Sequence, residues 1–455
     1  MNAQLSHTPD SGTRHFKAVL ALGLPLIGSN VAQMLVHVTD TVMLGWYGVT
    51  ELAAGVLTTG VFFFMFLLGN GFAMAVMGRV AAALGAGDDT QMRRDTRMGI
   101  WLSVLFGLAA FPVFWFADPI LRALGQEAEL AALAQEYLRI NWIGLPAALI
   151  VATLKSYLAA QERTRVVLWI TLCGVALNAL MNWVLIFGNW GAPELGLRGA
   201  AISSVGVSVA SAVMTAIYAT RARGLEHVEL FTRFWRPDWP AFMAVARMGV
   251  PIGLATVFEA GMFQASALMM GWIGVVELAA HGIALELASL TFMVHLGFSH
   301  AATVRAGRAL GARDAIGLRK GAVAAIALSI GFAVVTVAAF LTLPTPLVGL
   351  FLDHENPQAP AILALGVSLL AVAALFQFVD ALQVITMGLL RGVHDTRVPM
   401  WFAGASYWLV GVPASYALAF MAGFGAQGLW LGLVAGLACA AGLLMWRFWH
   451  RDWVA

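Results

Sequence analysis

The chain has 455 residues, of which 60% are hydrophobic and 11% are charged. Ordinary soluble domains carry roughly 45–50% apolar and roughly 25% charged residues, so this sequence lacks the charged surface that a water-soluble fold of this size needs. The formal net charge of +2 indicates no particular class of partner.

Long apolar runs recur along the whole chain. A run of about twenty residues can cross a hydrocarbon layer of roughly 30 Å as an α-helix that rises about 1.5 Å per residue. The runs lack the period-two alternation of membrane-spanning β-strands. The predicted spans, in chain order, are residues 18–44, 52–78, 98–117, 136–160, 167–188, 199–220, 244–271, 278–304, 321–343, 361–390, 398–421 and 428–449. The sequence therefore predicts an all-α polytopic membrane protein with twelve transmembrane helices.

Proline and basic residues refine this topology. Pro25, Pro146, Pro251 and Pro413 lie inside predicted spans and are candidate kinks. All but three of the 26 Lys and Arg residues fall on the side of the N-terminus, and the exceptions are Arg122, Arg139 and Arg198. The positive-inside rule then predicts that both termini are cytoplasmic.

The two ends and the two cysteines add little chemistry. Residues 1–17 are polar, and the apolar run after them is too long for the core of a signal peptide. Cys173 and Cys439 both lie inside apolar runs, so we expect them to be packing residues without a disulfide or metal role.

The sequence contains an internal repeat. When the chain is aligned with itself so that Gly23 stands over Gly249, matching motifs recur without a gap as far as Asp88, which stands over Asp314. The matched pairs include Gly23-Leu24-Pro25 with Gly249-Val250-Pro251, Glu51-Leu52-Ala53-Ala54 with Glu277-Leu278-Ala279-Ala280, and Leu84-Gly85-Ala86 with Leu310-Gly311-Ala312. A weaker match, in a slightly longer register, pairs Thr164-Arg165-Val166 with Thr396-Arg397-Val398.

An even number of helices in each half gives both halves the same orientation, so we expect two six-helix bundles related by a pseudo-two-fold axis along the membrane normal. This is an architecture of transporters that rock about a central site. The predicted organisation is a cytoplasmic N-terminal segment (1–17), a first half (18–222), a cytoplasmic linker (223–243), a second half (244–449) and a cytoplasmic tail (450–455).

Four carboxylates lie inside predicted spans: Asp40, Glu259, Glu286 and Asp380. A charged side chain at mid-bilayer costs roughly 2.5–3.5 kcal/mol on insertion scales, so such acids are candidate functional residues. Counted from the nearest basic residue at a cytoplasmic helix end, Glu259 lies about 18 Å and Asp380 about 16 Å into the membrane. Asp40, at about 34 Å, and Glu286, at about 28 Å, lie toward the outer end.

Glu259 and Asp380 are the strongest candidates. No Lys or Arg is expected at their depth, because Lys155 lies near a cytoplasmic helix end and can extend to water. Gln377 and Gln383 stand three residues to either side of Asp380 and share a helical face with it. A carboxylate without a basic partner, such as Glu259 or Asp380, can bind a proton or hold a cation, and coupled transport requires one of the two. The alternative, that the four acids only hydrogen-bond to neighbouring helices, stays open, above all for Glu286.

The repeat includes the motifs of the helical scaffold but not the acidic residues. In the alignment that pairs Gly23 with Gly249, Asp40 stands over Ser266, and Gln33 stands over Glu259. The scaffold is therefore duplicated while its acids are not, and each half is expected to carry its own acidic site. Aromatic and Met residues around Glu259 suit flat lipophilic cations, although most such residues simply pack. They are Phe258, Met262, Phe263, Phe292, Met293 and Phe376.

Several motifs together resemble one transporter family. Gly23-Leu24-Pro25 with Gln33 and Val38-Thr39-Asp40-Thr41-Val42-Met43 resembles the first helix of the MATE (multidrug and toxic compound extrusion) transporters. Four further motifs resemble those of the NorM branch of that family. They are Phe258-Glu259-Ala260, Thr303-Val304-Arg305, Phe376-Gln377 with Asp380 and Gln383, and Leu390-Arg391-Gly392. The resemblance covers essentially the whole chain.

The resemblance implies an antiporter that expels lipophilic organic cations in exchange for Na⁺ or H⁺, with no cofactor. It assigns cation coupling, including a possible Na⁺ site, to Glu259 and Asp380. It also implies that Asp40 is the acid of a second site, which Asn178 and Asn182 can join. Where Asn182 stands, some relatives have an acid, so a strong metal-ion site in the first half is not expected. Glu286 stands where the family suggests a neutral polar residue.

The expected partners are cationic small molecules and membrane lipid, without nucleic acid, and a monomer suffices for the mechanism. Short loops without organelle targeting indicate a bacterial inner membrane. The main alternative function is a flippase for a lipid-linked substrate on the same two-bundle architecture. An ATP-driven pump is excluded by the absence of a Gly-Lys-Ser/Thr motif. No catalytic motif accompanies His37, His281, His295 or His300, so an intramembrane enzyme is not expected.

Overall fold

The computed structural model describes residues 12–352 and 357–454, and this part of the chain is almost entirely helical, without a strand. The first bundle contains α1 (Gly12–Tyr47), α2 (Val49–Ala86), α3 (Asp89–Ala109), α4 (Phe111–Trp115), α5 (Ala117–Ala123), α6 (Ala128–Asn141), α7 (Gly144–Ala160), α8 (Thr164–Phe187), η1 (Asn189–Gly191) and α9 (Leu197–Arg221). The chain continues through η2 (Glu226–Val228), α10 (Trp239–Ile273), α11 (Val275–Gly311), α12 (Ala315–Thr342), α13 (Pro344–Gly349), α14 (Ala359–Gly392), α15 (Arg397–Ala405), η3 (Ser406–Gly411), α16 (Val412–Tyr416), η4 (Ala417–Met421) and α17 (Gly425–Trp449).

All twelve predicted spans correspond to helices. Within the described ranges, ten helices are long and apolar enough to cross a membrane, and α6 with α7 forms an eleventh span that bends by 51°. The twelfth is the continuous stretch from α15 to η4, in which α-helical and π-helical turns alternate. The first helix begins at Gly12, so residues 12–17 of the predicted N-terminal segment are helical and continuous with the first span, while residues 1–11 lie outside the described part.

Two of the four candidate proline kinks are sites of real irregularity. The bend between α6 and α7 falls just before Pro146, and the two π-helical segments flank the short helix that contains Pro413. A proline removes one backbone donor and crowds the preceding turn, which explains both breaks. Helices α1 and α10 instead continue through Pro25 and Pro251.

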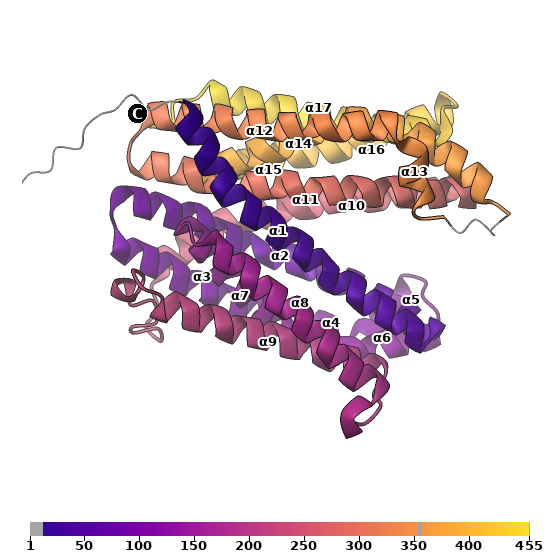
Figure 1. Ribbon diagram of the computed structural model, residues 1–455, viewed down its shortest axis with the longest axis horizontal. Coiled ribbons are helices and arrows are strands. Elements are labelled where there is room, and N and C mark those ends of the chain that lie inside the picture. Colours follow the sequence, from indigo (N-terminus) through magenta and orange to yellow (C-terminus); the bar gives the residue numbers. More distant parts are fainter. Residues whose placement is uncertain (1–11, 353–356, 455) are drawn as a thin grey trace, which may run out of the picture.

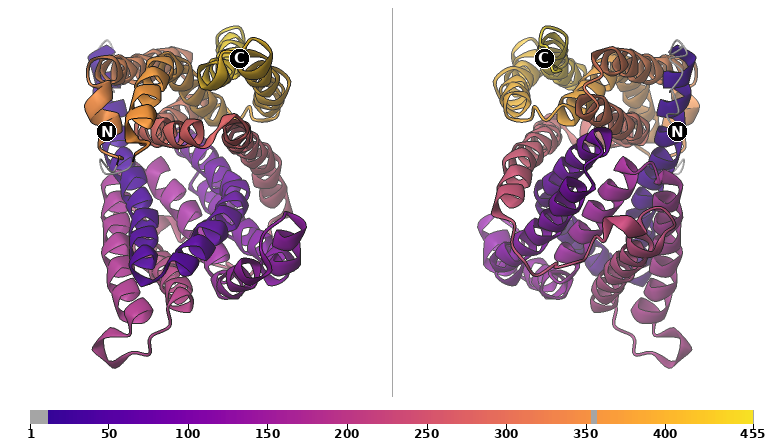
Figure 2. Two further views of the ribbon diagram at one scale, coloured as in Figure 1. Left: turned by 90° about the vertical axis from the view of Figure 1, so that its right-hand side faces the viewer. Right: turned by 90° about the vertical axis from the view of Figure 1, so that its left-hand side faces the viewer.

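The helices form two bundles. Helices α2 to α9 lie together in one group and α10 to α17 in the other, while α1 runs along the boundary between them (Figure 1). Views along the long axis show the same two groups (Figure 2). Both ends of the described chain lie at one end of the molecule, as an even number of spans requires (Figure 1).

The repeat seen in the sequence is also present in the backbone. Asp88 and Asp314, which the alignment of Gly23 with Gly249 pairs, both cap the following helix by accepting a hydrogen bond from a backbone N–H three residues on. Glu162 and His394, which the alignment of Thr164 with Thr396 pairs, both adopt positive φ values, of 60° and 63°, at corresponding turns. The two alignments therefore mark equivalent positions of two structurally related halves.

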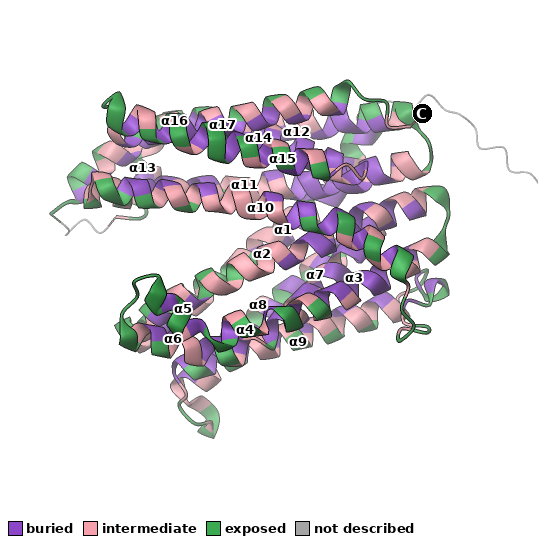
Figure 3. Ribbon diagram, turned by 180° about the vertical axis from the view of Figure 1, so that it is seen from behind, coloured by how far each residue is buried: buried purple, intermediate pink, exposed green. Residues whose placement is uncertain are grey.

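The bundles touch at one end only. Most residues of α2 from Gly69 to Ala83 are buried, whereas only three are buried before Gly69. The same contrast is present along α11, where burial is densest after His295. The ribbons of the two bundles correspondingly converge at the end that holds the termini and diverge at the other (Figure 3). The two bundles are therefore packed together at the end that holds the termini and separated at the other.

Glycine makes this contact possible. An added Cβ at Gly71 of α2 would overlap the backbone of Gly249 and Gly253 on α10. An added Cβ at Gly311 of α11 would overlap the carbonyl oxygen of Ala82 on α2. Helix backbones can approach this closely in membranes only where side chains are absent or very small. These glycines therefore let α2 pack directly against the second bundle.

Ion pairs reinforce the same end. Arg308 of α11 donates to Glu162 after α7, and Arg94 of α3 donates to Asp238, the N-cap of α10. Asp238 also accepts from the backbone N–H of Ala241 at 3.1 Å. The hydrogen bond from Arg94 lowers the pKa of the Asp238 carboxyl group below its ordinary value. The start of α10 is thus held to the first bundle by charge.

We expect Asp238→Asn to lower thermal stability slightly at neutral pH. Exposed ion pairs contribute about 0–1 kcal/mol, and Asn still caps the helix. Folding lowers the pKa of Asp238, so its charge contributes fully to the stability of the protein above the ordinary Asp pKa. This contribution is lost as the pH falls through the lowered pKa of the folded state. The melting temperatures of wild type and variant in detergent should therefore differ at neutral pH and converge as the pH falls below the ordinary Asp pKa of about 3.9. A difference that grows on acidification would contradict this.

Candidate functional site

Two acids meet inside the second bundle. Asp380 of α14 is 1% exposed, and the charges of Asp380 and Glu259 of α10 influence each other directly. Gln383 approaches the Glu259 carboxyl group and also donates to the hydroxyl of Tyr407 at 2.6 Å. Tyr407, on the π-helical segment η3, is fully buried and close to both acids. The site is built by α10, α14 and η3.

This acidic cluster has unused oxygens. Among the described residues, the buried side-chain atoms without a hydrogen-bond partner include Glu259 Oε1, Asp380 Oδ2, Gln377 Oε1 and Gln383 Oε1. Carboxylate and amide oxygens are ligands for hard cations, and a carboxylate can alternatively take up a proton. No group of three or more His, Cys, Asp or Glu within residues 12–352 and 357–454 could hold a metal ion. A cation here would therefore depend on the two acids together with glutamine oxygens.

A positive charge lies near this cluster and was not part of the sequence-based expectation. Arg391, eleven residues after Asp380 on α14, interacts electrostatically with Glu259. The prediction that no Lys or Arg lies at the depth of these acids did not include this interaction, because it counted only the rise per residue along the helix. A guanidinium group on a long side chain can act at a distance from its own Cα.

The first bundle holds the other acidic site. Asp40 Oδ1 on α1 accepts hydrogen bonds from Asn178 Nδ2 at 2.9 Å and from Asn182 Nδ2 at 2.6 Å, both on α8. The two asparagines are fully buried, and Asn182 Oδ1 has no partner among the described residues. The family resemblance linked these two asparagines to Asp40, and the geometry brings the three together.

Asp40→Asn should weaken the binding of cationic dyes. The change removes the negative charge of the site and places a third amide beside two others, while it conserves the size of the side chain. Hydrogen bonds to charged groups contribute about 1.5–3 kcal/mol, which corresponds to about tenfold or more in affinity. Fluorescence titration of purified protein would measure the dissociation constant. An unchanged constant in a folded variant would remove Asp40 from the binding site.

The remaining predicted site residues do not join either cluster. Gln33 of α1 is exposed and has no hydrogen bond to the three-residue site around Asp40 in the described structure. Glu286 of α11 is exposed as well. Phe376 and Phe263 pack edge to face with ring centroids 6.0 Å apart, and Phe376 and Met262 are buried. The two phenylalanines pack within the second bundle.

Two of the four histidines singled out in the sequence link helices of the second bundle. His281 accepts from the indole N–H of Trp430 at 3.1 Å, and His295 shares a hydrogen bond of 2.8 Å with Ser329. Each of these bonds links neighbouring helices of the second bundle. Neither of these two bonds involves Glu286.

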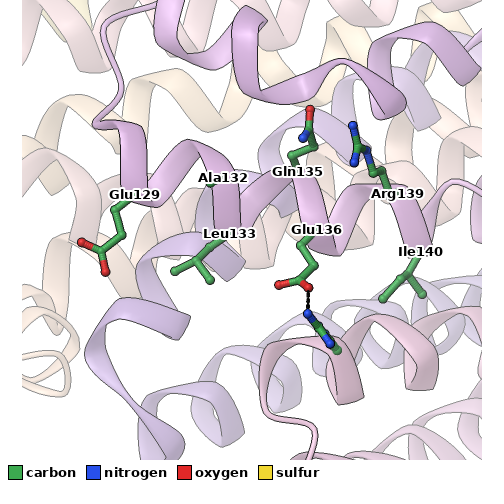
Figure 4. Close-up of a pocket in the computed structure, with 8 residues that line it drawn as sticks. Glu129, Ala132, Leu133, Gln135, Glu136, Arg139 and Ile140 are labelled. Carbon is green, nitrogen blue, oxygen red and sulfur yellow. Dashed lines mark ion pairs between the residues drawn. The ribbon is translucent and has the colours of Figure 1, made fainter.

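A surface hollow of about 680 Å³ lies away from both acidic sites. It is lined by α6 residues and by Arg198 of α9, which forms an ion pair with Glu136 (Figure 4). Arg139, which also lines the hollow, stacks on Trp115 with its guanidinium carbon 4.8 Å from the ring centre. Both arginines are thus satisfied by neighbouring groups, and the hollow holds none of the predicted site residues.

Sequence reasoning missed three residues near the sites. Tyr407 lies in a run of aromatic and apolar residues that looks like any packed helix. Arg391 was treated as the marker of a cytoplasmic helix end and as part of the Leu390-Arg391-Gly392 motif, and its interaction with Glu259 was not predicted. Lys155 was expected to reach water, but it turns into the first bundle and donates to Thr171 Oγ1 at 2.8 Å. Their side chains depend on tertiary packing, and only the rarity of tyrosine, six in the chain, could have drawn attention to Tyr407.

Two related bundles that touch at one end, with a half-buried acid at the site of the first and a buried acid at the site of the second, define a secondary transporter built from parallel repeats. The MatE family model matches residues 25–184 and 251–417. The chain belongs to this family. It is 46% identical over 447 residues to a protein named "Probable multidrug resistance protein NorM" from Rhizobium meliloti, covering 98% of this chain and 96% of that one. A second protein of the same name, from Agrobacterium fabrum, is 44% identical over 434 residues and covers 95% and 93%.

Solved structures share the fold at lower identity. A eukaryotic MATE transporter superposes with a TM-score of 0.85 at 20% identity and covers 98% of this chain and 97% of its own. A structure described as the outward-facing conformation of a multidrug resistance MATE family transporter gives a TM-score of 0.85 at 21% identity, with 95% of each chain covered. The fold of all twelve spans is therefore that of the MATE transporters.

Proposed function

We propose that this protein is a secondary active multidrug efflux transporter that exchanges lipophilic organic cations for Na⁺ or H⁺. The observation that carries the proposal is the pair of acids inside the second bundle, half-buried Glu259 and buried Asp380, each with a buried oxygen that has no hydrogen-bond partner among the described residues. The names of the NorM relatives support the multidrug role. No cofactor is needed, because the coupling ion gradient supplies the free energy.

The mechanism follows from competition for negative charge. A cationic substrate enters between the bundles and is neutralised by the acids, and it leaves when Na⁺ or a proton occupies the same carboxylates. The two halves, residues 18–222 and 244–449, act as the moving bodies, with the segment 223–243 as the linker. Their close contact at the terminal end and their separation at the other correspond to one of the two alternating states.

The orientation and setting belong to the same proposal. With both termini in the cytoplasm, the open end faces outward, and the protein lies as a monomer in a bacterial inner membrane. The distribution of Lys and Arg supports this orientation. Membrane lipid is the surrounding partner. A flippase for an anionic lipid-linked substrate is not favoured, because two acids, Glu259 and Asp380, meet at the buried site of the second bundle.

Everted membrane vesicles test the proposal. A fluorescent cationic dye is supplied outside the vesicles, and Na⁺ and H⁺ gradients are imposed separately. We expect one gradient to drive uptake of the dye and a dissipating ionophore to abolish it. Dye transport that persists after both gradients have collapsed would rule out the antiport mechanism. The gradient that drives uptake identifies the coupling ion.

A further inference from the structure

A hollow that the transport mechanism does not use lies in the second bundle, at the end that holds the termini. It has a volume of about 250 Å³ and is formed by the start of α12, the end of α17 and the chain that follows α17. The indole N–H of Trp453 donates to the carbonyl oxygen of Phe448 at 2.9 Å, which folds this chain back over the helix end. Helices α12 and α17 lie on the side of the second bundle that faces away from the first (Figure 1). The residues that line the hollow include Leu318, Arg319, Phe448, Trp449, Arg451 and Trp453.

Two guanidinium groups line this hollow with most of their hydrogen-bonding capacity unused. Arg319 Nη2 lies 3.8 Å from Asp452 Oδ1, which is beyond hydrogen-bond length, and the two side chains are 68% and 82% exposed. Arg451 stacks on Trp453 with its guanidinium carbon 5.2 Å from the ring centre. Among the residues that the structure describes, neither guanidinium donates a hydrogen bond. Each presents a planar fork of N–H donors that matches the oxygens of a phosphate group.

The equivalent position in the first half is covered by the chain itself. Arg319 and its counterpart in the repeat, Arg93, each lie five residues after an N-cap aspartate. Arg93 Nη1 donates to the carbonyl oxygen of Val228 at 3.4 Å, in the segment that follows α9. Val228 and Leu230 of that segment are buried in the hydrophobic core. In the second half the corresponding arginine lines a hollow instead, so a ligand there would take the place of the covering chain.

Aromatic and apolar side chains place the hollow at the boundary between membrane and water. Trp446 and Trp449 of α17 are 57% and 36% exposed. Tryptophan is enriched at the level of the lipid headgroups in membrane proteins. On α12, the exposed Ile316 and Val323 stand three residues before and four residues after Arg319, so the three share one helical face. A ligand bound here meets positive charge on the water side and apolar surface on the membrane side.

We propose that this hollow binds the headgroup of an anionic glycerophospholipid from the leaflet at the end that holds the termini. Arg319 and Arg451 donate to the phosphate oxygens, and one acyl chain lies along the exposed face of α12. Basic pockets between membrane-spanning helices bind anionic headgroups by the same chemistry. This inference does not rest on the proposed efflux function.

Two other ligands offer a phosphate group but fit the site less well. A soluble phosphate ester has the same charge, but it would leave the exposed tryptophans and the apolar face of α12 unused. A zwitterionic headgroup would bring an ammonium group close to two guanidinium groups. The site therefore favours a lipid with a net negative charge.

Photolabelling of the full-length protein tests both the place and the ligand. The purified protein is inserted into phosphatidylcholine nanodiscs that contain a trace of phosphatidylglycerol with a photoactivatable group near the top of one acyl chain. A phosphatidylcholine probe with the same photoactivatable group is used in parallel. Mass spectrometry of the digested protein then measures the label in residues 315–323 and 446–454. Glycerol 1-phosphate is added as the soluble competitor.

Paired substitutions separate charge from fold. Arg319→Gln with Arg451→Gln removes both guanidinium groups, and Arg319→Lys with Arg451→Lys keeps both charges. The matched control is Arg221→Gln with Arg236→Gln, which removes two exposed arginines at the same end of the molecule but away from the hollow.

We expect phosphatidylglycerol to label the two segments at least about fivefold more than phosphatidylcholine. The Gln pair should lower this labelling by about twentyfold, because each basic residue near the surface contributes about fivefold. The Lys pair and the control pair should stay within about threefold of the wild type, and glycerol 1-phosphate should leave the label unchanged.

Four results would overturn the proposal. Equal labelling by the two lipids would show that the site does not distinguish headgroup charge. Undiminished labelling of the Gln pair would remove the two arginines from the site. Equal loss in the Gln and Lys pairs would show that the arginines only support the fold. Displacement by glycerol 1-phosphate would identify a soluble phosphate ester, and not a lipid, as the ligand.

Discussion

Glu259→Gln and Asp380→Asn are each expected to abolish gradient-driven dye export while leaving the protein folded in the membrane. Each change keeps the size of the side chain and removes one of two carboxyl groups that meet inside the second bundle. Without both acids, the coupling ion loses the oxygens that hold it, and the gradient no longer drives exchange. In a one-for-one exchange of monovalent cations no net charge moves, so a tenfold ion gradient, about 1.4 kcal/mol, can sustain a dye gradient of about tenfold, which should fall to equilibration in either variant.

The assay is dye accumulation in everted vesicles at matched expression. Glu129→Gln is a suitable control, because it makes the same chemical change at an exposed residue away from both acidic sites. Normal accumulation in both Glu259→Gln and Asp380→Asn would show that ion coupling does not run through the second bundle. Loss in the control as well would point to a general defect of the vesicles.

Gly71→Val is expected to shift the protein away from the state in which the terminal end is closed. Its side chain would meet the backbone of Gly249 and Gly253, which cannot rotate aside as a flexible side chain could. Overpacking of a tight contact costs about 1–3 kcal/mol, enough to change the ratio of the two states by about tenfold or more. Transport should slow to a similar degree, because a cycle needs both states.

A cysteine reporter measures this shift. Ala75 is fully buried one turn beyond Gly71, and Ala75→Cys adds a thiol after Cys173 and Cys439 have been replaced by Ala. A membrane-impermeant maleimide added from the side of the termini should label this thiol slowly in the parent and quickly with Gly71→Val. Gly60→Val, on the same helix with open space around it, should leave the rate unchanged. Continued protection in Gly71→Val would mean that the contact adapts.

The fold was largely predictable from the sequence because the membrane imposes simple rules. Apolar length identified all twelve spans, and the internal repeat was reproduced by the matched caps Asp88 and Asp314. Boundaries were less certain. Helix α1 begins earlier than the apolar run, because polar residues extend a helix beyond the hydrocarbon. The π-helical turns around Pro413 were also beyond prediction, since proline indicates a break and not its form.

The sites were predictable where chemistry is local to one helix. Asn178 and Asn182 share a face by spacing alone, and they do meet Asp40. The contacts of Tyr407 with Gln383 and of Lys155 with Thr171 join residues 24 and 16 positions apart on different helices. Which faces meet depends on how each helix is rotated, and an almost uniformly apolar sequence carries little information about rotation.

The parallel orientation of the two halves constrains how the opposite state can form. In proteins whose repeats are inverted, one half can adopt the internal shape of the other, and this exchange alone moves the opening across the membrane. Here Asp88 and Asp314 cap equivalent helices that run in the same direction, so an exchange of shapes would leave the opening where it is. Access from the end that holds the termini must therefore come from tilting one half against the other. The hinge has to lie among the elements common to both, which are α1 along the boundary and the chain between α9 and α10 (Figure 1).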